Sequence, residues 1–461
     1  MFKISDRPIN YIFLMLQGKL IGENSTLALI LLFLSVLFIA FGFYYLVFQL
    51  FNDSFTAFIG ALLFSILPNV LEIYHSLIFL NMNTAIGIYI FSTGFFIKFI
   101  NSKKKAFLYL SFFSYLLVIF WYEVGFFEPF VLMAYCFCLK RNNLIKYLVP
   151  FFAAEIIYLA CRFYIMPVLN QSVSQHAFSL TGVPLAFVEL LHHYAGRYLL
   201  RSLIYGFYLF FVLVPKWLFF VFLIFDIAAL YILKKLLKDN RLKISGKQIL
   251  FAIAAAIFFI APLFLSRSGG IGGRHLVLPS IGIVILAIWW FSKLGSFWKP
   301  LLLVITGLFL IVSQGNSWAQ VVSCRINRAI YDSLKANKDK LLASQRIVFD
   351  NKSFSDKIKF TFVERDFNLL NTYFGAQALE DRGLVSMVNL AVDHIDKPVF
   401  VAKGPLNFTP DGQVNFEVIA QENYRRIRKA MVSLPQEGTL VIGFNDIFKA
   451  DHNYGFIKNE R

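Results

Sequence analysis

The chain has 461 residues, of which 58% are hydrophobic and 15% charged, and it contains 55 phenylalanines. A soluble domain of this length does not need so much apolar surface, so the composition excludes an ordinary soluble protein and predicts membrane-spanning helices. The net charge is +17. Residues 1–316 hold 24 basic and 10 acidic residues, whereas the rest of the chain is nearly balanced. The excess therefore belongs to the apolar part, which indicates membrane topology rather than nucleic-acid binding.

Residues 1–26 form a mixed segment, whose apolar stretch 11–16 is too short to cross a membrane and favours a helix lying at the interface. No signal-peptide pattern precedes residue 27. Apolar runs then recur as far as residue 316 and predict a transmembrane domain of about ten helices. The expected spans are 27–50, 55–74, 79–100, 106–122, 126–139, 146–166, 206–233, 249–265, 275–292 and 298–315.

Basic residues orient these spans. The clusters at residues 103–105, 140–146, 234–247 and 293–299 all fall on one side of the predicted alternation. Together with Lys98, that side holds 15 of the 24 basic residues and only two acids. By the positive-inside rule this side is cytoplasmic. We therefore expect a multi-pass protein of a bacterial inner (plasma) membrane, with both termini and the opposite loops extracytoplasmic.

Residues 317–461 lack any spanning run and predict a small extracytoplasmic α/β accessory domain. We expect a helix over 318–342 that leaves the membrane, strands at 346–349, 357–363, 399–401 and 439–444, and a basic helix at 423–434. That basic helix is suited to anionic lipid or glycan, although its pattern favours an ordinary solvated helix face. The domain contains no nucleophile elbow, P-loop or zinc spacing.

A glycine-rich loop between two apolar runs carries Arg267, Arg274 and His275. Glycine lets the main chain approach a ligand closely, and a guanidinium group donates two parallel hydrogen bonds to phosphate. The loop therefore predicts a site for the phosphate of a lipid-linked donor. A charged turn that merely connects two membrane helices is the alternative.

Four further residues stand at predicted outer helix ends, on the same side as this loop: Glu72, His75, Glu123 and Glu128. Ionisable groups near membrane depth are costly and are therefore functional candidates. A carboxylate there can accept a proton from an acceptor hydroxyl or hold a divalent cation beside phosphate. Arginine can stabilise a departing phosphate. Ion pairing between helix ends is the alternative for each glutamate.

The order of motifs along the chain resembles a known family. Arg7-Pro8 precedes the first span, Glu72 follows Pro68 by four residues, Glu123 has Pro129 downstream, and Arg274 opens the sequence Arg-His-Leu-Val-Leu-Pro-Ser. This order resembles the GT-C class of integral-membrane glycosyltransferases, with the O-mannosyltransferase-like and the bacterial serotype-converting glucosyltransferase-like proteins as the nearest branch. The resemblance covers residues 5–316.

The resemblance implies sugar transfer from a polyprenyl-phosphate donor to a surface glycan, a lipid-linked glycan or a protein, on the extracytoplasmic face. It implies that Arg274 lies at the donor phosphate and that Glu123 and Glu72 line the site. Such enzymes also carry a catalytic acid in a loop after an initial helix, whereas here only Asp6 stands beside the Arg-Pro motif. We therefore expect either a coding start farther upstream or an inactive member of the family.

Other functions are also compatible with these residues. An O-antigen polymerase or ligase uses extracytoplasmic arginines and lipid-linked sugars, but it usually has a long loop between spans rather than a large C-terminal domain. A transporter or flippase for lipid-linked glycans performs no covalent chemistry and is expected to place its charges near the membrane midplane. Glu155 and Asp226, which lie deeper in the predicted spans, keep this alternative open. A non-catalytic assembly protein is the third.

Overall fold

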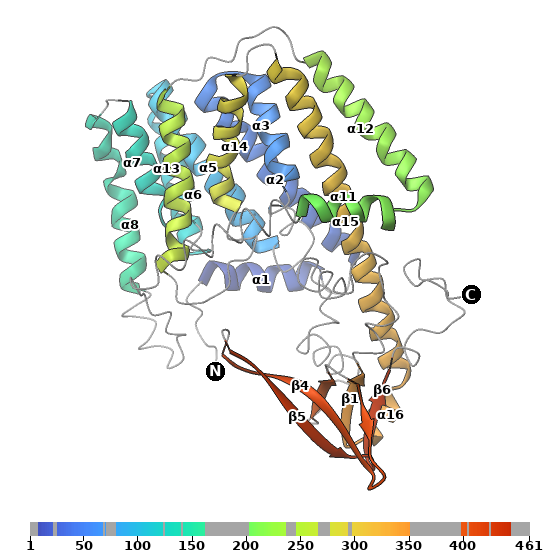
Figure 1. Cartoon of the computed structure of the whole chain (residues 1–461). Helices are drawn as coiled ribbons and strands as arrows, with labels where there is room; N and C mark the ends of the chain where they lie inside the picture. The colour runs from blue at the N-terminus through green and yellow to red at the C-terminus, as the bar shows by residue number, and fades with distance from the viewer. Residues whose placement is uncertain are drawn as a thin grey trace. The chain divides into compact units, whose positions relative to one another are not determined.

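The structure is a computed structural model and divides into two compact units (Figure 1). The first comprises residues 1–208 and 216–314, and the second comprises residues 209–215 and 315–461. The residues that the structure describes are 8–21, 25–67, 70, 80–122, 125–139, 142–161, 202–236, 246–265, 277–293, 297–350, 398–402, 405–423 and 426–443.

The first unit is built from helices. Those lying wholly within it are α1 (Pro8–Ile21), α2 (Ser25–Phe51), α3 (Ser54–Ile66), α5 (Leu80–Ser102), α6 (Lys105–Ile119), α7 (Glu128–Cys138), the 3-10 helix η4 (Asn142–Leu148), α8 (Val149–Ala160), α12 (Lys216–Leu236), α13 (Gly246–Leu265) and α14 (Val277–Ser292). Two more, α11 (Ser202–Leu213) and α15 (Trp298–Ala336), contain points at which the chain passes between the units.

The lengths of these helices bear on the membrane prediction. Among the described residues, five helices are long and apolar enough to cross a membrane: Thr26–Phe51, Leu80–Ser102, Asn143–Ala160, Lys216–Lys235 and Pro300–Trp318. Six shorter apolar helices accompany them. Large apolar side chains lie on outer faces, as lipid contact requires, with Phe225 73% exposed and Trp217 68% exposed. These are the features of a helical membrane protein, although fewer described helices reach spanning length than the ten expected.

Tight turns join consecutive helices of the first unit. Asn52 ends α2 and Lys103 ends α5, each with a left-handed φ, 52° and 60° respectively. Asp53 then caps α3, because its carboxylate accepts a hydrogen bond from the Thr56 backbone N–H at 2.7 Å. Such short connections leave neighbouring helices antiparallel, and α2 packs against both α3 and α5.

Helix α1 lies across one end of α2 and α5 (Figure 1). Its Phe13 ring contacts the buried Trp121 ring, with centroids 4.6 Å apart. Several apolar side chains of α1 are exposed, among them Leu20 at 67% and Ile12 at 57%. This arrangement extends the expected short interfacial helix to fourteen residues.

Two expected helix boundaries are wrong. The span 206–233 is broken into α11 and α12 because Pro215 has no backbone N–H to donate and restricts the residue before it. Conversely, the expected helices 298–315 and 318–342 are largely one element, since α15 continues unbroken to Ala336 before the short α16 (Lys338–Ala343). The polar residues after 314 are compatible with helix and do not end it.

The second unit contains two small sheets. β1 (Arg346–Asp350) lies between β2 (Val399–Ala402) and β6 (Thr439–Ile442), and all three strands are parallel. β3 (Asn407–Phe408), β4 (Gln413–Asn423) and β5 (Arg426–Pro435) form an antiparallel sheet. The sheets share a core that includes Val348, Ala402, Val414 and Phe416. The strands expected near 346, 399 and 439 are confirmed, and the one expected at 357–363 lies outside the described residues.

The helix expected over 423–434 is wrong, because this stretch forms β5. β4 and β5 pair as a long hairpin in which Val414 lies opposite Leu434 and Phe416 opposite Val432. Alternate residues of β4 are buried, as the period of two in a strand requires. The basic residues suggested an exposed helix face, but a partner strand with matching apolar alternation decided the structure.

Candidate functional site

One end of the helical unit is marked by the turn at Lys103. The last turns of α2 and α5 are joined there, because the Asn101 side-chain amide donates to the Gln49 carbonyl oxygen at 3.0 Å. The first turn of α13 reaches the same place, since Gln248 Nε2 donates to the Leu50 carbonyl oxygen at 2.7 Å. We call this the Lys103 end of the unit.

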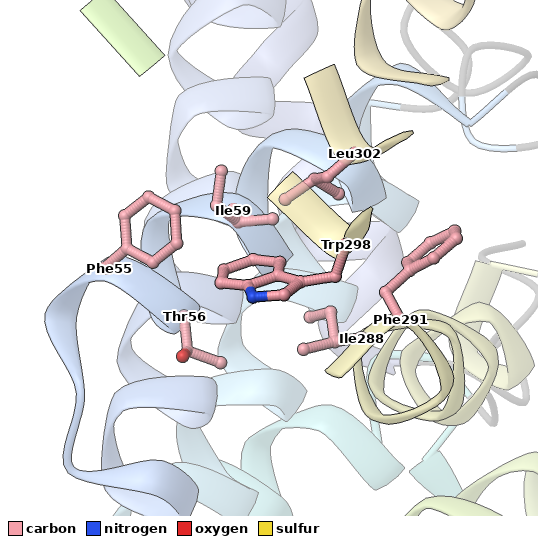
Figure 2. A pocket seen from close by; sticks show the side chains of 7 residues that line it. All are labelled: Phe55, Thr56, Ile59, Ile288, Phe291, Trp298 and Leu302. Carbon is pink, nitrogen blue, oxygen red and sulfur yellow. The ribbon is translucent and has the colours of Figure 1, made fainter. Parts of the chain in front are cut away.

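An apolar pocket also lies at the Lys103 end (Figure 2). Its wall comes from the start of α3, the end of α14 and the start of α15, and the lining residues are Phe55, Thr56, Ile59, Ile288, Phe291, Trp298 and Leu302. The hydroxyl of Thr56 is engaged by Asp53. None of the predicted site residues lines this pocket, and its apolar wall offers little to a sugar or a phosphate.

The opposite end of the unit follows from the direction of the chain. Helices α3, α6, α8 and α13 start at the Lys103 end and run away from it, whereas α5, α7 and α14 run towards it (Figure 1). The far helix ends are therefore the C-termini of the first group and the N-termini of the second. These ends adjoin, in sequence, the segments 71–79, 123–124 and 266–276 that carry the predicted acids and arginines.

Most of the predicted site residues lie outside the described part of the chain. They are Asp6, Glu72, His75, Glu123, Arg267, Arg274 and His275. Trp121 and Gly125, each two residues from Glu123, are described and buried. Trp121 is 5% exposed. A Cβ atom on Gly125 would lie 2.5 Å from the Tyr89 ring, so the backbone at Gly125 rests directly on α5.

Glu128 is the predicted site residue that the structure describes. It begins α7 beside Pro129, and its side chain is 0% exposed. Its Oε1 atom accepts a hydrogen bond from the Thr93 hydroxyl of α5 at 3.0 Å. Its Oε2 atom is buried and has no hydrogen-bond partner among the described residues. The sequence placed Glu128 at an outer surface, whereas the structure encloses it between helices.

A second buried carboxyl group accompanies Glu128. The Tyr115 hydroxyl of α6 donates to Glu155 Oε1 of α8 at 3.1 Å, and Glu155 is 5% exposed. The two glutamates are close enough to interact electrostatically. We call Thr93, Tyr115, Glu128 and Glu155 the buried carboxyl cluster. Among the described residues, neither glutamate forms an ion pair with a cation.

The cluster lies at mid-depth in the helices. Thr93 stands nine residues before the end of α5, which corresponds to about 14 Å from the Lys103 end at the rise of an α-helix. Tyr115 stands ten residues after the start of α6, or about 15 Å from the same end. Both distances are about half of the roughly 30 Å thickness of a hydrocarbon core. Glu128 reaches this level because α7 has only eleven residues.

The buried hydroxyl residues in and beside this cluster were not predicted from the sequence. Thr93, Ser92 and Ser111 are buried polar residues in apolar helices. Ser92 and Ser111 bind each other across the α5–α6 interface, each hydroxyl donating to the carbonyl oxygen of the other residue at 2.8 and 2.9 Å. The available signal was the presence of hydroxyl residues within strongly apolar spans, a pattern typical of interhelical hydrogen bonding in membranes.

A third buried acid is located elsewhere in the unit. Asp226 of α12 is 5% exposed, and its Oδ1 atom accepts a hydrogen bond from Gln314 Nε2 of α15 at 2.7 Å. Leu230, one turn farther along α12, contacts the face of α15 at Gly307. This pair joins α12 to α15 and is separate from the buried carboxyl cluster.

Within the described ranges, no group of three or more His, Cys, Asp or Glu side chains is arranged to hold a metal ion. Comparison with protein-family models, with curated proteins and with solved structures finds no match for this chain. Functional inference therefore depends on the motifs and on the geometry described above.

Proposed function

We propose that the protein is a membrane glycosyltransferase of GT-C type that moves a sugar from a polyprenyl-phosphate donor to an acceptor hydroxyl on the extracytoplasmic face. The observation that carries the proposal is a combination of sequence and fold. The predicted acids and arginines occur in an order that resembles this class. The described helix ends adjoining those segments all belong to the end of the unit opposite Lys103.

The proposed chemistry assigns a role to each group. A carboxylate, Glu123 or Glu72 with Asp6 as the third candidate, takes the proton of the acceptor hydroxyl. The acceptor oxygen then forms a bond to the anomeric carbon of the donor sugar. The bond from that carbon to the phosphate oxygen breaks, and polyprenyl phosphate leaves with the electron pair. Arg274 and Arg267 stabilise the negative charge that develops on the phosphate.

The remaining predicted residues have supporting roles in this proposal. His275 lies next to Arg274 and donates to the same phosphate, and His75 lies near Glu72 in sequence. Glu128 is enclosed at mid-depth, so we assign it no contact with the sugar. The acceptor is a surface glycan, a lipid-linked glycan or a protein, and the membrane is the plasma membrane of a bacterium.

Glycan composition tests the proposal. We would delete the gene, analyse the surface polysaccharide by mass spectrometry, and complement with wild type, Arg274→Ala and Arg328→Ala. Arg328 is a matched control because its side chain is 84% exposed and pairs only with Asp332, at 3.6 Å. Loss of one sugar per repeat, restored by wild type and Arg328→Ala but not by Arg274→Ala, supports transfer. Full activity of Arg274→Ala would refute the central role of that residue.

A transporter or flippase for lipid-linked glycans is the second candidate, and the buried carboxyl cluster favours it. Coupled transporters place ionisable groups near the membrane midplane, and Glu128 and Glu155 are acids buried between helices. Deletion would then remove whole glycan chains from the surface rather than one sugar per repeat. A polymerase or ligase would change chain length or attachment while leaving the composition of each repeat unchanged.

A further inference from the structure

We propose that the buried carboxyl cluster is a proton-binding site, which holds an exchangeable proton between α5, α6, α7 and α8. The ligand is the proton itself, bound by Glu128 and Glu155. This inference goes beyond the proposed function and does not depend on it, since it applies equally to a transferase and to a transporter. It is argued from the hydrogen bonds, the burial and the charges of the cluster.

The two carboxyl oxygens of Glu128 differ in their hydrogen bonds, and this decides which of them takes the proton. Glu128 Oε1 already accepts the hydrogen bond of the Thr93 hydroxyl. Glu128 Oε2 is fully buried and has no hydrogen-bond partner among the described residues. A buried carboxylate oxygen with no donor is unfavourable, because it loses its hydration without replacement. Oε2 is therefore the atom on which a proton most reduces the cost of burial.

The combined negative charge of Glu128 and Glu155 also favours a bound proton. An unpaired carboxylate in a low-dielectric interior is costly, and a second carboxylate nearby increases that cost. Glu155 is that second group, and its donor among the described residues is the neutral Tyr115 hydroxyl. Two ionised carboxylates at this depth would repel each other without compensation. Neutralising at least one of them with a proton is the simplest way for the folded protein to retain both.

The titratable groups described around Glu128 and Glu155 on these four helices are tyrosines and a cysteine. Tyr89 faces it from α5 and Tyr115 from α6. Tyr135 and Cys136 are buried on α7, and Tyr158 is buried on α8. Tyrosine and cysteine are neutral at ordinary pH and supply no positive charge.

The nearest described cation on these helices is a lysine near the Lys103 end. Lys98 lies on α5, five residues beyond Thr93, or about 8 Å along the helix axis. It is half-buried and forms no ion pair with either glutamate. On the described parts of the four helices, the proton is therefore the available counter-charge for the pair.

Infrared spectroscopy of the full-length protein in lipid nanodiscs tests the proposal directly. A protonated carboxyl group gives a carbonyl stretching band that is distinct from that of a carboxylate and that shifts in D2O. We expect this band at neutral pH, with part of its area lost in Glu128→Gln and part in Glu155→Gln. The control is Asp53→Asn, because Asp53 caps α3 by accepting the Thr56 N–H, lies outside the buried carboxyl cluster, and should leave the band unchanged when replaced.

A second variant separates proton binding from a packing role. Thr93→Val removes the donor to Glu128 Oε1 while keeping the acid and nearly the same volume. The carbonyl band should then move to higher frequency with its area unchanged. Asp226 is another buried acid with a signal of its own in the spectrum. The carbonyl bands of the variants are therefore compared with one another, and the total band area is not used by itself.

The results that overturn the proposal are equally specific. An identical carbonyl band in wild type, Glu128→Gln and Glu155→Gln would show that neither group carries the proton. So would a Thr93→Val variant with the wild-type frequency. Gel filtration and thermal melting establish that each variant is folded. If Glu128→Gln does not fold, Glu128→Leu takes its place. The test measures no sugar transfer, so its failure is distinct from a failure of the proposed function.

Discussion

A close approach between α13 and α14 at Gly282 offers a test of the packing in the first unit. Gly282 of α14 lies against α13, and a Cβ atom added there would be 2.2 Å from the Ala252 carbonyl oxygen and 2.7 Å from the Ala256 backbone nitrogen. Both are backbone atoms, so no side-chain rotation can relieve the contact. An ordinary contact distance of about 3.5 Å requires α13 and α14 to separate by roughly 1.3 Å.

Gly282→Ala should therefore destabilise the protein by about 3 kcal/mol, at the upper end of typical overpacking effects. Reversible unfolding in mixed micelles, followed by tryptophan fluorescence, measures this change. Gly18→Ala is the matched control, because Gly18 is an exposed helical glycine of α1 with nothing within 4 Å of an added Cβ. It should change stability by less than about 1 kcal/mol, in the stabilising direction. Equal stability of the two variants would refute the close packing of α13 on α14.

Two other predictions concern the ends of elements. Gly438→Ala should destabilise the second unit more than Gly412→Ala. Both glycines have φ near +75°, which costs an alanine about 1 kcal/mol at either position. Of the two, only Gly438 has a neighbour that an added Cβ would meet, Gln345 at 2.9 Å. Limited proteolysis of the full-length protein compares the two rates, and equal rates would contradict the contact. Asn101→Ala and Gln248→Ala should each cost about 1 kcal/mol and add in the double variant, because each amide donates to a separate α2 carbonyl. A double variant no less stable than either single one would show that the bonds are not independent.

The helices were predictable because their signal is strong and local. Apolar runs of spanning length leave few alternatives, and most described helices begin and end within a few residues of the expected positions. The break at Pro215 carried a clear signal, since proline lacks the backbone donor that a helix interior requires. The β4–β5 hairpin was harder to predict, because the pairing of Phe416 with Val432 is a tertiary fact that neither stretch specifies alone.

The depth of Glu128 was not predictable from its position in sequence. Glu128 lies near the start of the expected span 126–139. That position suggested a surface residue, on the assumption that every apolar run spans the full membrane. α7 has eleven residues, and Trp121 and Gly125, which precede it in the chain, are buried. Which acids reach the interior therefore depends on where short helices start relative to their neighbours, and that is decided by packing.

This distinction between depth and surface separates the two functional candidates. Acids and arginines for sugar transfer are expected at a helix end, where both a lipid phosphate and an acceptor hydroxyl can arrive. Glu128 and Glu155 lie about 15 Å away from the Lys103 end, enclosed by four helices. A charge at that depth has little to offer a glycan at the surface, but it lies in the contact between α7 and α5. An unfolded glutamate releases its proton above about pH 4, whereas the proposed folded cluster still holds one, so stability should fall as pH rises above that value, and Glu128→Gln should flatten that dependence.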